Sequence, residues 1–248
     1  MTLHLDRDTD QTSQELAKAP ARKPFWKRPW IIPLAVLVVY YIYTQASPYV
    51  GVPEDQAPLQ PHQGFPAYYP LLFVHIGAGT VAMLTMILQV WPWLRQHHPR
   101  IHRWSGRSYV FASVVGSCVA LTIVWYAPKP GKVGALCLAI AWLVTTVAGY
   151  RAARRRDFEK HRRFMLYSFG IAANNMWAAY AAMIIQDFNI PIDVAYYQEA
   201  ARWIPWVGNL MLVQWWLYRT ARRRKAQAVA PLAAIESGTV VNPEQKAA

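Results

Sequence analysis

Six long apolar stretches divide the chain, and none of them contains an Asp, Glu, Lys or Arg. They occupy residues 30–46, 69–93, 108–126, 133–150, 164–186 and 203–218. Each has about the length, roughly 17–25 residues, that an α-helix needs to cross the hydrocarbon core of a bilayer. Because an unpaired charge inside a bilayer costs several kcal/mol, this pattern predicts an all-α integral membrane bundle of about six transmembrane helices.

The positive charges between these stretches alternate along the chain. Of the 26 Lys and Arg residues, 23 lie before residue 30, in residues 95–107, in residues 151–163 or after residue 218. Basic residues collect in the cytoplasmic loops of membrane proteins, so both termini are predicted to be cytoplasmic. The net charge of +13 then follows from topology and from attraction to anionic lipid headgroups, and we expect no nucleic-acid partner.

The ends of the chain differ from the predicted bundle, which spans residues 30–218. Residues 1–29 contain acids and prolines and lack a cleavage signal, so we expect a disordered cytoplasmic arm. Residues 219–248 are first basic and then rich in Ala without an apolar face, which predicts a basic tail that becomes disordered from Ala226.

One histidine lies well inside a stretch. His75 shares a helical face with Gly79, Ala82, Met86 and Gln89, a set of small and polar residues that is typical of a face turned to the bundle interior. A ligand-binding His75 would bind haem, relay protons or hydrogen-bond a quinone. Alternatively, it is a neutral histidine that hydrogen-bonds to a neighbouring helix.

The two predicted cytoplasmic loops within the bundle each carry histidine among arginines. His102 follows Pro99 in one loop and His161 precedes the fifth stretch in the other; the adjoining arginines are Arg103, Arg107 and Arg162. Anchoring at the headgroups explains most of the arginines, but it does not require histidine. We therefore predict His102, His161 and these arginines as candidate ligand-binding residues. No carboxylate or thiolate lies near His97, His98 and His102 to complete a metal site, so we predict none.

Amide side chains occupy the last two stretches. Asn174 and Asn175 fall near the middle of the fifth stretch, and Asn209 and Gln214 lie in the sixth. An unpaired amide in hydrocarbon is costly, so each needs a partner in another helix. These amides, with Gln89, either pack the helices together or line a polar ligand pocket that includes Asn175.

Several short motifs follow one another at characteristic spacings. They are HIGAG from His75, HRWSGRSY from His102, WLVTTVAGYR from Trp142, HRRFM from His161, and Asn209. This combination resembles the bacterial multi-pass membrane family called domain of unknown function 2306, over residues 68–218. The resemblance implies a helical bundle in a bacterial cytoplasmic (inner) membrane, and it implies that histidine recurs at the positions of His75, His102 and His161.

Two hypotheses of function remain open, beside the possibility that the chain is a purely structural partner in a larger complex. In the first, the chain binds haem b through His102 and His161 and transfers electrons, with quinone or other membrane proteins as partners. In the second, it is a non-redox protein or assembly factor that binds an anionic lipid headgroup or a small ligand. The sequence shows no carboxylate pair, Ser-His-Asp set or phosphate-binding glycine loop, so no enzymatic reaction is assigned.

Overall fold

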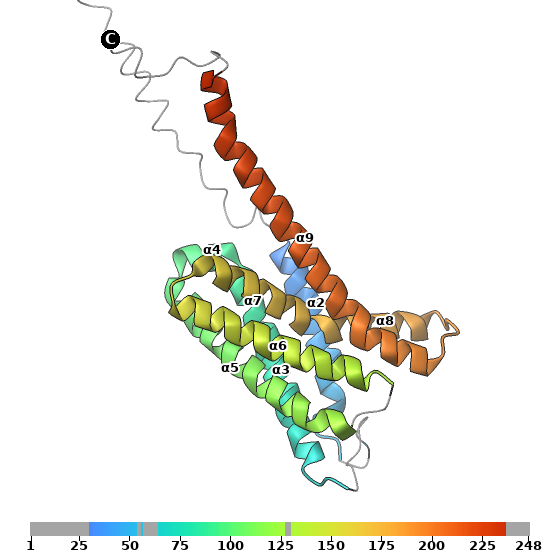
Figure 1. Cartoon of the computed structure of the whole chain (residues 1–248). Helices are drawn as coiled ribbons and strands as arrows, with labels where there is room; N and C mark the ends of the chain where they lie inside the picture. The colour runs from blue at the N-terminus through green and yellow to red at the C-terminus, as the bar shows by residue number, and fades with distance from the viewer. Residues whose placement is uncertain (1–29, 54–55, 57–63, 127–129, 237–248) are drawn as a thin grey trace, which may run out of the picture.

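The computed structural model describes residues 30–53, 56, 64–126 and 130–236, and every long element in them is helical (Figure 1). The prediction of an all-α bundle is therefore confirmed. The elements are α2 (Ile31–Ala46), the 3-10 helix η2 (Ser47–Tyr49), α3 (Tyr68–Val90), α4 (Pro92–His97), α5 (Pro99–Ile123), the 3-10 helix η4 (Val124–Tyr126), α6 (Lys132–Arg154), α7 (Phe158–Ala172), α8 (Asn174–Asp187) and α9 (Val194–Glu236).

Four helical segments are long and apolar enough to cross a membrane. They correspond to the first four predicted stretches and run Ile31–Tyr49, Tyr68–Val90, Pro99–Tyr126 and Lys132–Arg154. The last two stretches lie in α7 with α8 and in α9, which do not meet the same criterion of length and hydropathy. The count of six spans thus stays a prediction.

The fifth stretch is not one continuous helix. It is divided at Ala173 into α7 of 15 residues and α8 of 14 residues. No proline or glycine stands at the division, but two asparagines follow it, and the Asn174 Nδ2 atom donates to Asn175 Oδ1 at 3.0 Å.

The helices pack around α5, which lies between α3 and α6, while α7 packs against α6 and α9. Side chains from all these layers meet in one core, which includes Met83, Tyr109, Trp142 and Phe169. Large apolar side chains also cover the outside of the bundle; Val36, Phe111, Val144 and Ile204 are all more than half exposed. Such a surface suits contact with lipid, and it agrees with a membrane protein.

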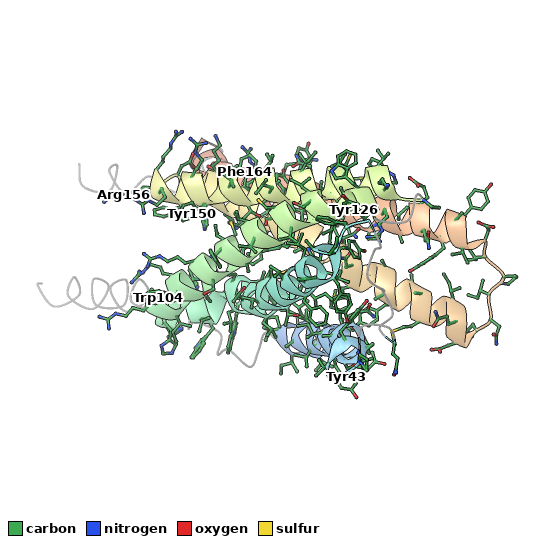
Figure 2. All side chains as sticks on the ribbon, turned by 90° about the horizontal axis from the view of Figure 1, so that it is seen from below. Tyr43, Trp104, Tyr126, Tyr150, Arg156 and Phe164 are labelled. Atoms are coloured by element: carbon green, nitrogen blue, oxygen red, sulfur yellow. The ribbon has the colours of Figure 1, made fainter. Side chains whose placement is uncertain are left out.

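The basic loops lie together at one end of the bundle. Figure 2 places Trp104 and Arg156 at this end and Tyr43 and Tyr126 toward the other. We call it the basic end: α3 and α6 finish there, and α5 and α7 begin there. The last helix, α9, continues as a helix beyond Tyr218 to Glu236 and projects from the bundle (Figure 1). The predicted arm 1–29 and the final residues 237–248 lie outside the described residues.

Candidate functional site

A buried hydroxyl pair fixes how α5 and α7 face each other. Tyr109 of α5 and Ser168 of α7 are both 0% exposed, and their oxygen atoms are 2.6 Å apart. Ser168 also hydrogen-bonds to Thr146 of α6 at 2.6 Å, and the Trp142 indole donates to the Tyr109 hydroxyl at 3.3 Å. Three helices are therefore joined at one depth by a buried polar network.

The two candidate histidines occupy equivalent positions on α5 and α7, relative to this hydrogen-bonded pair. His102 lies seven residues before Tyr109, and His161 lies seven residues before Ser168. Seven residues are almost two complete helical turns and about 10.5 Å of rise, so His102 and His161 start from matching faces of α5 and α7 nearer the basic end. The two imidazoles are close enough to interact electrostatically. The structure thus brings these two predicted site residues together.

His161 is held in a defined orientation. Its Nδ1 atom lies 2.9 Å from the Gly149 carbonyl oxygen of α6. Because a carbonyl oxygen only accepts, Nδ1 carries a proton, so Nε2 is the ring nitrogen that can offer a lone pair to a ligand. Gly149 permits this close approach, since a Cβ atom there would lie 2.7 Å from the Met165 sulfur. The contact between α6 and α7 therefore leaves His161 with a free ligand nitrogen.

His102 is different, because its ring lacks a comparable partner. The Nδ1 atom is buried without a hydrogen bond among the described residues. The His102 backbone carbonyl accepts from Gln89 Nε2 at 2.9 Å, and the same nitrogen donates to Ser105 at 2.6 Å. Gly106 leaves room for this amide, since a Cβ atom there would lie 3.0 Å from Gln89 Oε1. Gln89 therefore holds the backbone at His102 through a hydrogen bond.

The predicted arginines differ in which groups they contact. Arg103 is exposed, and its charge acts on His102 together with that of Arg95. The Arg107 guanidinium lies 5.3 Å from the centre of the Trp104 ring, and the Arg162 guanidinium lies 4.9 Å from that of Trp216. Such cation–π contacts direct both groups toward aromatic side chains. Arg95 and Arg103 are thus the arginines that act on His102.

His75 lies apart from the other two histidines. Its Nδ1 atom is 3.0 Å from the Gly116 carbonyl oxygen of α5, so Nε2 is again the ring nitrogen that can offer a lone pair. Gly116 follows His102 by 14 residues, about 21 Å along the helix. The structure therefore places His75 in a separate part of the bundle, half-buried between α3 and α5.

The predicted amides do not form one pocket. Asn175 is exposed and accepts from Asn174, whose own Oδ1 atom is buried without a partner among the described residues. Asn209 instead joins α9 to α7, because its Nδ2 atom donates to the Gly170 carbonyl oxygen at 2.7 Å. Asn209 therefore packs two helices together, as one of the two alternatives from the sequence anticipated.

The sequence did not single out the hydroxyl network of Tyr109, Thr146 and Ser168 as a unit. One signal was available in α5, where buried hydroxyl groups recur at every fourth residue; they belong to Ser105, Tyr109, Ser113 and Ser117. Spacing of this kind places side chains on one helix face. A run of four hydroxyl groups on a buried face indicates a polar contact with neighbouring helices.

Within the described residues, no group of three or more His, Cys, Asp or Glu side chains is arranged to hold a metal ion. This finding does not bear on haem, because bis-histidine ligation uses only two imidazoles and the porphyrin supplies the other four ligands.

Comparison with curated proteins and with solved structures found no match. Residues 72–217 match the family model described as "Predicted membrane protein (DUF2306)". The matched region begins in α3, ends in α9 and includes all three histidines discussed above. It covers more than half of the chain and agrees with the apolar helices and the lipid-compatible surface. The chain therefore belongs to the DUF2306 family of membrane proteins.

Proposed function

We propose that this membrane protein binds haem b between α5 and α7, where His102 and His161 would hold it, and that it carries electrons. The observation that supports the proposal best is the shared register of the two histidines. Each lies seven residues before one partner of the Tyr109–Ser168 hydrogen bond. Bis-histidine ligation requires two imidazoles that face each other at one depth, and this register supports a common depth for the two rings.

The donor atoms also suit the proposed cofactor. The Gly149 carbonyl oxygen holds the His161 ring and leaves its Nε2 lone pair available, which is a common arrangement for a ligating histidine. A buried polar atom without a partner, such as His102 Nδ1, calls for a group that the described side chains do not supply. Haem, when bound, supplies one-electron transfer. Arg95 and Arg103 would balance the carboxylates of its propionates.

A second candidate function is the binding of a small anion or an anionic lipid headgroup at the same place. Arg95 and Arg103 offer it positive charge and hydrogen-bond donors. One observation favours this smaller ligand: neither of the two grooves described below is lined by a histidine. Neither groove is therefore a haem cavity, whereas a headgroup at the basic end needs no enclosed cavity.

The proposal also assigns a location and partners. The excess of Lys and Arg supports an orientation in which the basic end faces the cytoplasm of a bacterial cell, in the inner membrane. An electron carrier at that position would exchange electrons with a membrane-soluble quinone or with another membrane protein.

The test is a reduced-minus-oxidised absorption spectrum of the full chain purified in detergent from haem-replete cells, with haem quantified as the pyridine haemochrome. We expect a b-type α-band and about one haem per chain. His102→Ala and His161→Ala are each expected to lose most of this haem, because one remaining imidazole binds haem much more weakly.

His97→Ala is the matched control. His97 lies at the same end of the bundle, but its Nδ1 atom bonds to Trp93 O within its own helix α4 at 3.0 Å, and its ring stacks on Trp93. This variant should keep full haem content. A flat spectrum from wild type, or equal haem loss in all three variants, would exclude the haem site. Binding of an anionic headgroup that depends on Arg95 and Arg103 would then favour the second candidate.

A further inference from the structure

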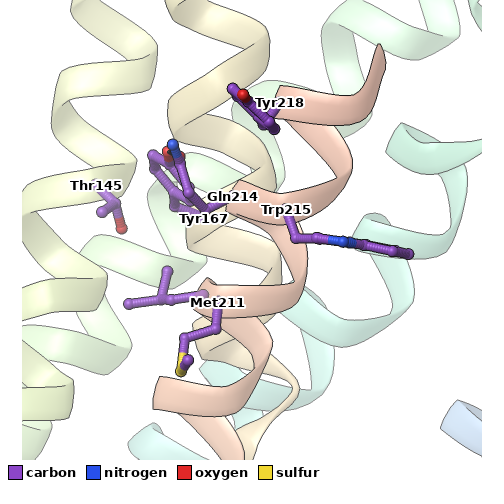
Figure 3. A pocket seen from close by; sticks show the side chains of 7 residues that line it. Thr145, Tyr167, Met211, Gln214, Trp215 and Tyr218 are labelled. Carbon is purple, nitrogen blue, oxygen red and sulfur yellow. Dashed lines mark hydrogen bonds between the residues drawn. The ribbon is translucent and has the colours of Figure 1, made fainter. Parts of the chain in front are cut away.

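A groove runs along the outside of the bundle where α6, α7 and α9 meet. It has a volume of about 630 Å³ and is lined by Thr145, Tyr167, Leu210, Met211, Gln214, Trp215 and Tyr218. Figure 3 shows Thr145 of α6 and Tyr167 of α7 opposite Met211 and Gln214 of α9. Tyr167 donates a hydrogen bond to Gln214, so the main polar groups of the wall satisfy each other. The groove therefore presents a mostly apolar surface.

A smaller groove of about 230 Å³ adjoins the first one. Tyr218 lines both, and Arg219, Arg222 and Arg223 complete the smaller one. The Arg219 guanidinium lies 4.7 Å from the centre of the Trp215 ring, and that of Arg222 lies 5.7 Å from the centre of the Tyr218 ring. These stacking contacts hold both positive charges beside the mouth of the apolar groove.

The two grooves have the dimensions and polarity of one leaflet of a bilayer. Leu210 and Arg219 are nine residues apart on α9, which corresponds to about 13.5 Å along the helix. This is close to half of the roughly 30 Å hydrocarbon core. If the predicted sixth stretch, residues 203–218, crosses the bilayer, the apolar part extends from the middle of the membrane toward the basic end, and the arginines lie at the level of the headgroups.

We propose that this groove is a binding site for an anionic phospholipid. One acyl chain lies along the apolar wall between α6, α7 and α9, and the phosphate is bound by Arg219 and Arg222. Arginine suits this role because its planar guanidinium forms paired hydrogen bonds with phosphate oxygens. The site is separate from His102 and His161 and does not depend on haem.

Native mass spectrometry of the full chain in detergent tests this proposal. The protein is titrated with phosphatidylglycerol and with phosphatidylcholine that carry the same acyl chains. We expect the first phosphatidylglycerol to bind more tightly. Two arginines near a membrane surface together contribute roughly thirtyfold in affinity for anionic lipid, so Arg219→Gln with Arg222→Gln should remove most of that preference.

The control variant carries Arg154→Gln and Arg155→Gln, which remove the same charge from exposed positions at the basic end. This control should keep the preference for phosphatidylglycerol. If both double variants lose the preference equally, the lipid is attracted by the overall positive charge and not by a defined site, and the proposal is overturned. No preference in wild type would also overturn it. Thr145→Phe fills the apolar groove without changing the charge, so it should weaken the binding of both lipids. Unchanged binding would refute the placement of the acyl chain in this groove. Gel-filtration profiles like that of wild type confirm that each variant is folded.

Discussion

The hydrogen bond between Tyr109 and Ser168 should couple α5 to α7 measurably. Tyr109→Phe removes the hydroxyl group but keeps the ring, which packs edge to face against Phe169 with ring centres 4.7 Å apart. Ser168→Ala removes the other partner. Since both side chains are fully buried, neither variant gains contact with water that would replace the lost bond.

The expected loss in the free energy of unfolding follows from the contacts that each substitution removes. Hydrogen bonds between transmembrane helices contribute about 0.6 kcal/mol on average and about 1.7 kcal/mol at most. Tyr109→Phe loses one such bond at 2.6 Å and also leaves the buried Trp142 indole N–H without its acceptor, at a further cost of about 1 kcal/mol. We expect a loss of about 2 kcal/mol. Ser168→Ala loses bonds to Tyr109 and Thr146 and should cost a similar amount.

A double-mutant cycle measures the bond itself. The free energy of unfolding is obtained in mixed micelles of dodecyl maltoside and dodecyl sulfate, followed by circular dichroism. The double variant should be about 1 kcal/mol more stable than the sum of the single losses predicts, because both remove the same bond. Thr122→Val is the control, since exposed Thr122 bonds only within α5, and it should change stability by less than about 0.5 kcal/mol. Strict additivity would refute the register on which the histidine pairing rests.

Two further predictions concern single substitutions, and a third concerns the orientation of the chain in the membrane. Gly149→Ala should shift α7 away from α6 and lower haem content without abolishing folding, because the new Cβ atom meets the flexible Met165 side chain; unchanged haem content would contradict this. Asn209→Ala should cost about 1 kcal/mol in the same unfolding assay, through loss of the bond to Gly170, and a neutral result would remove its packing role. An impermeant thiol reagent added to intact cells should label a cysteine at Gln60 but not one at Ala226; the reverse pattern would invert the predicted orientation.

The apolar pattern of the sequence was enough to predict the helices but not their interruptions. Charge-free stretches correspond directly to α2, α3, α5 and α6, because the length of a helix in a bilayer is set by the bilayer. The division at Ala173 was not predicted, because hydropathy is averaged over a window much longer than the single residue at which the helix is interrupted. The extension of α9 to Glu236 was not anticipated either, since its residues after Tyr218 lack the apolar pattern.

Candidate histidines were identifiable from the sequence, but their pairing was only a hypothesis. The sequence places His102 and His161 in loops at the same membrane level, without stating which faces meet. The register of α5 against α7 depends on the contact of Tyr109 with Ser168, 59 residues apart. A contact between residues so far apart in the chain produces no repeating pattern in the sequence, apart from the regularly spaced hydroxyl groups of α5. The separation of His75 from the pair, by contrast, follows directly from its position inside the second stretch.

The contact of α2 with α8 bears on the order in which the protein assembles during its synthesis. Tyr180 of α8 donates to the Leu37 carbonyl oxygen, and its ring stacks on Tyr40 at 6.2 Å between centres. The hydrogen-bonded residues are 143 positions apart, whereas α3 with α5 and α6 with α7 pair over short connections. Local pairs close first because their loops are short. The first helix also contacts α3, its neighbour in the chain, and can pack there early. Its contact with α8 forms only after most of the chain has been made, and this contact completes the bundle.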